Sequence, residues 1–141
     1  MLIRKKLKIK RVEYRRWFNF DEGFYEGEVK LGTNLPHGRG IFIHKSTGLI
    51  CEGYRKKGLR WGLGRQIEPT QHGYSIYEGK FKQNYPHGLG TLELDNGDIY
   101  KGMFRNGCIE GKGELFVESE GRAYTGSFHD GKRDDVFIVK T

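Results

Sequence analysis

The sequence predicts an all-β protein: an elongated, single-layer antiparallel meander of stacked β-hairpins, preceded by a basic N-terminal arm. Three observations lead to this fold class. A Tyr-x-Gly-x-aromatic unit recurs along the chain, a Gly-x-Gly pair follows most copies of it, and large residues alternate with small or polar ones around both. This alternation has the period of a strand, and no window carries a sustained helical period.

Five copies of the unit start at residues 25, 51, 77, 100 and 124, spaced 26, 26, 23 and 24 residues apart. Each copy is predicted to be a strand, a glycine-containing turn and a second strand, which makes about ten strands. Links such as residues 95–98, with Asn96-Gly97, return the chain to the next copy. The residues that define the repeat are Tyr25, Gly27, Gly38, Gly40, Gly53, Gly62, Gly64, Tyr77, Gly79, Phe81, Gly88, Gly90, Tyr100, Gly102, Phe104, Gly111, Gly113, Tyr124, Gly126 and Phe128.

The alternation of glycine and aromatic residues has a steric interpretation. A glycine leaves the backbone uncovered, so an aromatic ring from a neighbouring strand can lie on it. Two copies depart from the pattern. The second has Cys51 and Arg55 in place of aromatic residues, and the fifth has Asp135 and Phe137 where the glycine pair is expected, which is typical of a terminal cap.

The units Tyr77-Glu-Gly-Lys-Phe and Tyr100-Lys-Gly-Met-Phe, each followed by a glycine pair, resemble the MORN repeat. The resemblance covers about residues 24–141 and rests on five copies in register. It implies an elongated, twisted single-layer sheet with a groove along one face. It also implies roles in cytoskeletal and ciliary scaffolds, in membrane-junction proteins and in protein-binding modules.

The arm is predicted to span residues 1–23, and the repeat sheet residues 24–141. The net charge of +7 lies in the first twenty residues, which hold eight cations and one glutamate. The remaining 17 basic and 17 acidic residues leave residues 21–141 neutral. Three interpretations of the arm stay open: a transit peptide, contact with an anionic membrane or nucleic acid, and docking on an acidic protein surface. Its candidate contacts are Arg4, Lys5, Lys6, Lys8, Lys10, Arg11, Arg15, Arg16 and Trp17.

The motifs of catalysis and cofactor binding are missing from the sequence. No Gly-x-Gly pair continues into a phosphate-binding loop, and no serine lies in a Gly-x-Ser-x-Gly elbow. His37 and His87 occupy matching Pro-His-Gly turns, which the repeat itself explains, and the other histidines lack metal-ligand spacing. Cys51 is interpreted as a small packed hydrophobe. We therefore expect no enzyme activity, no cofactor, no metal and no small-molecule substrate.

The function we predict from the sequence is a non-enzymatic scaffold that binds protein partners within a larger assembly. Four large side chains are more than a single-layer sheet can bury on one side: Phe42, Trp61, Tyr74 and Tyr85. They either cover the groove themselves or contact a bound partner. Family analogy suggests a cytoplasmic, cytoskeletal or ciliary location, with a mitochondrial one open because of the arm. Membrane tethering through the arm is the alternative, targeting of a separate enzyme is a third, and nucleic acid is disfavoured because the body is neutral.

Overall fold

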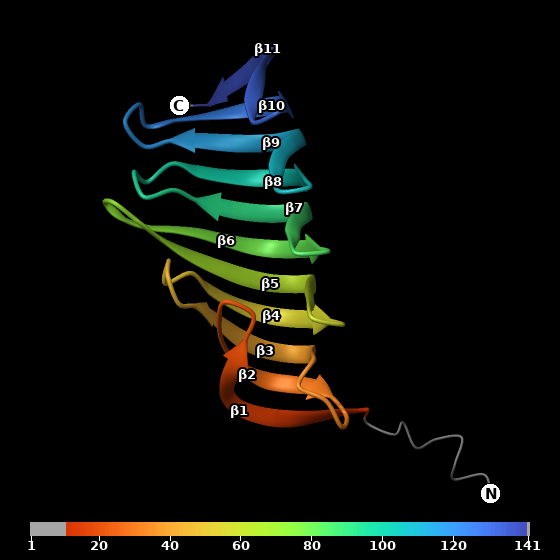
Figure 1. The fold of residues 1–141 in the computed structure, drawn as a ribbon. Helices are drawn as coiled ribbons and strands as arrows, with labels where there is room; N and C mark the ends of the chain where they lie inside the picture. The colour runs from red at the N-terminus through yellow and green to blue at the C-terminus, as the bar shows by residue number, and fades with distance from the viewer. Residues whose placement is uncertain (1–10, 141) are drawn as a thin grey trace, which may run out of the picture.

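The computed structural model describes residues 11–140, apart from the side chains at 135–137 and 140, and shows one antiparallel sheet of eleven strands in sequence order (Figure 1). The predicted fold class is confirmed. The part of the chain described here has no helix, so none of a length and apolarity able to cross a membrane. The strands are β1 (Val12–Phe20), β2 (Gly23–Lys30), β3 (Pro36–His44), β4 (Ile50–Lys56), β5 (Leu59–Thr70), β6 (Gly73–Lys82), β7 (Tyr85–Glu93), β8 (Ile99–Arg105), β9 (Cys108–Val117), β10 (Arg122–His129) and β11 (Lys132–Lys140).

The sheet has one strand more than the repeat pattern predicts, because part of the basic arm forms β1. A bulge between Arg15 and Phe18 interrupts the pairing of β1 with β2. Figure 1 shows the end of β1 curving across the neighbouring strands. Phe20 accordingly reaches Phe42 on β3, with 6.5 Å between the ring centroids. Residues 1–10 of the arm lie outside the described residues.

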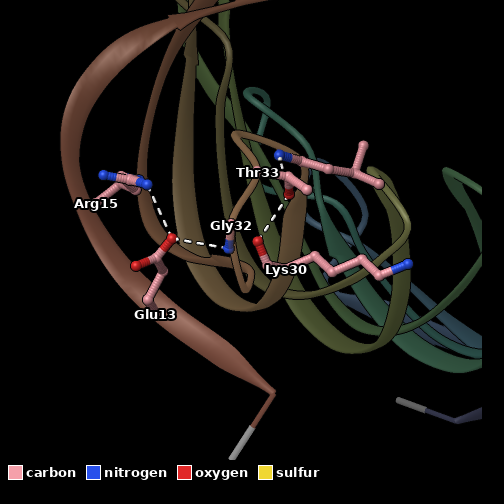
Figure 2. A network of polar contacts seen from close by, with 6 residues as sticks. Glu13, Arg15, Lys30, Gly32 and Thr33 are labelled. Carbon is pink, nitrogen blue, oxygen red and sulfur yellow. Dashed lines mark hydrogen bonds and ion pairs between the residues drawn. The ribbon is translucent and has the colours of Figure 1, made fainter.

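A small polar network ties β1 to the loop that follows β2 (Figure 2). The Glu13 carboxylate accepts hydrogen bonds from the Arg15 guanidinium at 2.8 Å and from the Gly32 backbone N–H at 3.1 Å. Within the loop, the Thr33 hydroxyl donates to the Lys30 carbonyl at 2.7 Å. The first strand is therefore held by side chains as well as by its backbone pairing.

The second strand of each copy has the same shift of register, and this shift explains why the first residue of each Gly-x-Gly pair is a glycine. Gly79 pairs with Gly90, but Phe81 pairs with Pro86, so β7 holds two extra residues between these points. Gly88 lies in that segment with φ of +89°, a conformation that a side chain disfavours. The equivalent glycines have φ of +106°, +74° and +93°: Gly38, Gly62 and Gly111.

The second glycine of each pair belongs to a continuous line across the sheet, which we call the glycine ladder. Each member lies directly opposite the next on the adjacent strand, from β2 to β10. Its members are Gly27, Gly40, Gly53, Gly64, Gly79, Gly90, Gly102, Gly113 and Gly126.

Tyrosine rings lie on the ladder from one side of the sheet, which we call the tyrosine face. A Cβ atom on Gly90 would lie 2.5 Å from ring atoms of Tyr77, so only glycine fits beneath that ring. The Tyr77 hydroxyl donates to the Lys80 carbonyl at 2.7 Å. Tyr25 and Tyr100 repeat this geometry with the residues three positions further along the chain, at 2.8 and 2.9 Å. The predicted packing of aromatic rings on glycine is confirmed.

The core on the tyrosine face is divided into two clusters. Edge-to-face contacts at 4.9–5.2 Å join the rings of the last three copies in the order Phe81, Tyr77, Phe104, Tyr100 and Phe128. The other cluster comprises Tyr25, Val29, Phe42 and Cys51. The division between the two clusters falls at the second copy, where Arg55 replaces an aromatic residue.

Candidate functional site

The opposite side of the sheet, which we call the open face, has two hollows along the glycine ladder, and we call the line of the ladder that joins them the open-face trough. A hollow of about 330 Å³ lies over Gly27, Gly40 and Gly53, and another of about 360 Å³ lies over Gly102, Gly113 and Gly126. The ladder positions are directed toward the tyrosine face, so on the open face the backbone lies bare between the flanking side chains. The first hollow is bordered by Tyr14, Glu26, Arg39, Ile41 and Tyr54. The second is bordered by Lys101, Lys112, Glu114, Thr125 and Ser127.

Large exposed side chains accompany this open-face trough. Leu63 and Leu89 are each the middle residue of a Gly-x-Gly pair, and they are 63% and 62% exposed. Leu89 lies opposite Met103, whose side chain is also exposed. Tyr54 is exposed and lies opposite Arg39. The apolar side chains therefore recur beside the ladder on successive copies, instead of being scattered singly.

The polar groups of the first hollow are held by specific contacts. Arg39 donates from Nε to the Tyr54 hydroxyl at 2.7 Å, and its guanidinium lies 5.0 Å from the centroid of that ring. The Glu28 carboxylate accepts from the Arg39 backbone N–H at 3.0 Å. A hydrogen bond to Glu26 raises the pKa of the Tyr14 hydroxyl. This hollow thus presents aromatic surface and oriented donors, which suit the binding of another chain.

The residues that the sequence singled out as partner contacts occupy different environments. Phe42 is only 8% exposed and packs against Phe20, so its ring covers the core. Trp61 is half-buried beneath the Lys56 ammonium. Tyr74, Tyr85 and Trp17 are exposed. Leu63, Leu89 and Tyr54 were not predicted from the sequence, although each adjoins one ladder glycine and alternation alone therefore places it on the opposite face.

The cationic arm is described only in part. Arg11, Arg15 and Arg16 are exposed, and Arg15 forms an ion pair with Glu13 at 2.8 Å. The cations Arg4, Lys5, Lys6, Lys8 and Lys10 lie outside the described residues. Some of the positive charge at this end of the sheet is therefore offset within the molecule.

The turn between β10 and β11 brings together a carboxylate and histidine group that sequence spacing does not reveal. Glu110, His129 and Asp130 have ligand-type atoms within 4.8 Å of one another. His129 contacts Glu110 at 2.8 Å and Asp130 at 3.5 Å, and the hydrogen bond to Glu110 raises the pKa of His129. The pKa of Glu110 is lowered, mainly because its carboxylate accepts a hydrogen bond from the Asp130 backbone N–H and, to a smaller extent, one from His129. These ion pairs explain the group without a metal.

Comparison with known proteins identifies the repeat. The MORN repeat model matches residues 77–99, 100–116 and 124–134, which belong to the third, fourth and fifth copies. The chain contains MORN repeats. Proteins of this kind use their repeats as modules for protein or membrane interaction. The first two copies keep the glycine ladder, but the second lacks the aromatic residues that Cys51 and Arg55 replace.

Several longer proteins are similar to part of this chain. Alsin of Homo sapiens is 37% identical over 62 residues, covering 41% of this chain and 4% of alsin. The ALS2 C-terminal-like protein of Homo sapiens is 29% identical over 97 residues, 64% of this chain and 9% of that protein. The inactive protein tyrosine kinase pTKL of Plasmodium berghei (strain Anka) is 24% identical over 103 residues, 72% of this chain and 8% of that protein. The chain thus spans less than a tenth of the length of these relatives.

Proposed function

We propose that this protein is a non-enzymatic scaffold that binds a segment of a partner protein in the open-face trough. The observation that carries the proposal is that exposed leucine, methionine and tyrosine side chains flank the glycine ladder on the same face as the two hollows. An exposed apolar surface that recurs across a sheet is typical of an interaction site.

The chemistry of the trough favours a protein as the occupant. Tyrosine, methionine and arginine are enriched in protein interfaces, and Tyr54, Met103 and Arg39 all line this side of the sheet. The Tyr54 ring and the Arg39 guanidinium hold each other in place, so little side-chain entropy is lost when a partner binds.

We further propose that the protein belongs to a multi-subunit assembly in the cytoplasm, associated with the cytoskeleton or with a ciliary axoneme. This location rests on the family resemblance. The transit-peptide interpretation, with a mitochondrial location, concerns mainly residues 1–10.

The experiment that tests the open-face proposal compares three exposed leucines. The immobilised full chain captures partners from a lysate, and mass spectrometry quantifies them for wild type, Leu63→Glu, Leu89→Glu and Leu31→Glu. Leu31 is a matched control because it is 58% exposed but lies in the loop after β2. We expect a common set of proteins to be lost with the first two variants and kept with the third. Equal capture by all four proteins would refute the proposal.

A second candidate function is tethering to an anionic membrane through the arm. Exposed Arg11 and Arg16 support it, since they continue the run of cations in residues 1–10 onto β1. Residues 21–141 carry no net charge, so the attraction would come from the arm.

A further inference from the structure

The second copy carries two arginines where the other copies carry apolar side chains. Arg55 on β4 lies directly opposite Arg60 on β5, on the tyrosine face of the sheet. At the equivalent positions, Phe81 lies opposite Pro86 and Phe104 opposite Ile109. Like charges directly opposite each other destabilise an antiparallel pair, so this copy replaces a stabilising contact with a repulsive one.

Both guanidinium groups are held in place by neutral partners. Arg55 lies 5.2 Å from the centroid of the Phe42 ring and donates to the Gly58 carbonyl at 2.9 Å. Arg60 lies 4.7 Å from the Phe81 ring centroid and donates to the Asn84 carbonyl at 2.6 Å. These contacts fix the orientation of the two groups without neutralising their charge.

No carboxylate in the part of the chain that the structure describes lies within 4.0 Å of either guanidinium as an ion-pair partner. Both residues are half-buried. Burial lowers the pKa of Arg55 and the charge of Arg60 adds to this effect, while Cys51, Tyr25 and Asp21 oppose it. A partly desolvated charge without a directly paired carboxylate is costly, and a bound anion would offset that cost.

An open cavity of about 310 Å³ adjoins the pair. This is near the lower end of the roughly 300–1,000 Å³ typical of ligand pockets. Its wall includes three cations, Arg55, Lys57 and Arg60, and one carboxylate, Asp21. The rest of the wall is largely apolar, with the polar Asn84 at its edge: Phe20, Leu35, Phe42, Leu49, Cys51, Gly58 and Leu59. The cavity therefore combines excess positive charge with apolar surface.

We propose that this cavity binds an acidic segment of a partner protein, with a carboxylate side chain on Arg55 and Arg60 and an adjacent apolar side chain against Phe42 and Leu49. A guanidinium forms strong, often paired hydrogen bonds with a carboxylate. The apolar wall favours a peptide over a bare inorganic anion, because it gives a neighbouring aliphatic side chain a place to be buried. The site lies on the tyrosine face and does not depend on the open-face trough.

The test uses the full chain and the capped dipeptide acetyl-Glu-Leu-amide as the probe. Nuclear magnetic resonance titration follows the Nε–Hε signals of Arg55 and Arg60 and gives the dissociation constant. We expect both signals to shift with the Glu probe, and acetyl-Gln-Leu-amide to bind about tenfold more weakly, since a charge-assisted hydrogen bond is lost. Equal binding of the two probes, or shifts confined to other residues, would overturn the proposal.

Variants separate ligand binding from stability. Arg60→Gln should weaken binding of the Glu probe about tenfold, whereas Lys101→Gln, at the second hollow of the open face, should leave it unchanged. Arg55→Phe restores the residue type found at Phe81 and Phe104, so it should raise the melting temperature and abolish binding. Asp21→Asn keeps both arginines and removes the competing carboxylate, so it should tighten binding.

Two results would contradict the assignment. A folded Arg55→Phe variant that binds the Glu probe like wild type would show that the pair is purely structural. Inorganic phosphate, titrated separately, should bind more weakly than the dipeptide. Tighter phosphate binding at the same two side chains would mean that the apolar wall plays no part and that the ligand is a phosphate, not an acidic segment.

Discussion

Gly102 offers the most direct test of the packing that builds this sheet. A Cβ atom at this position would lie 2.5 Å from the Gly113 Cα, 2.6 Å from the Lys112 carbonyl oxygen and 2.6 Å from the Tyr100 hydroxyl oxygen. Two of these three atoms are backbone, and carbon atoms pack optimally at about 3.5–4.0 Å. Gly102→Ala must therefore separate β8 from β9, displace the Tyr100 ring, or do both.

The expected cost follows from these contacts. Overpacking in a well-packed region costs about 1–3 kcal/mol. Displacing the Tyr100 hydroxyl also loses its 2.9 Å hydrogen bond to the Met103 carbonyl, worth about 1 kcal/mol. The sum is about 2–4 kcal/mol, which for a chain of this size lowers the melting temperature by roughly 10 °C. Gly102→Val should be worse, because its branched side chain adds further atoms at the same place.

Thermal unfolding followed by circular dichroism measures the effect, with Gly121→Asn as the control. Gly121 has φ of +63° in a turn, and nothing lies within 4 Å of its Cβ position. Asparagine tolerates this conformation, so the control should cost less than about 1 kcal/mol. If Gly102→Ala melts within about 2 °C of wild type, or if the control loses as much stability, the close approach of the ladder to the tyrosine rings does not stabilise this sheet.

Three further predictions address single contacts and the arm. Tyr100→Phe removes the hydroxyl that donates to the Met103 carbonyl and should cost about 1 kcal/mol by thermal unfolding; an unchanged melting temperature would show that water replaces the contact. His129 has a raised pKa in the folded state, so its stabilising effect should be full below pH 6.5 and lost as pH rises through the raised value. Glu110 has a lowered pKa, so its stabilising effect should be full above pH 4.5 and lost as pH falls through the lowered value. A pH series of melting temperatures for wild type and His129→Gln checks both, and identical curves would contradict them. Deleting residues 1–10 removes five cations but leaves β1 intact, so it should greatly weaken salt-sensitive binding to vesicles of anionic lipid; full binding by the shortened chain would place the interaction on the repeats.

The repeat pattern predicts most of the fold because its signals are local. Tyr77, Gly79 and Phe81 alternate at the period of a strand, and Asn96-Gly97 indicates a tight turn, which the structure confirms between β7 and β8. Since every hairpin repeats the same local solution, neighbouring copies must pair in sequence order. The glycine ladder follows from this pairing, because it places the equivalent glycines of neighbouring strands opposite each other.

The candidate surfaces were harder to predict, because exposure depends on contacts between strands. Phe42 has the same character as Tyr74 in the sequence, yet it is buried because β1 curves back and places Phe20 beside it. Leu63 resembles a core residue in the sequence, but it is exposed on the open face, because the neighbouring ladder residue Gly64 is directed toward the tyrosine face. In a single-layer sheet, a side chain is buried only if it lies on the face that the aromatic rings cover. The sequence of one copy alone does not show which face that is.

The repeat, its strand period, the positions of the glycines and the concentration of positive charge in residues 1–20 are all read directly from the sequence. The pairing of Val12–Phe20 with β2 and the position of Arg55 opposite Arg60 became known only from the contacts between strands. The reason is physical: alternation and turn chemistry act between residues close in the chain, whereas bulges set the cross-strand register. A register difference of two residues, as in every copy of this protein, changes which side chains meet.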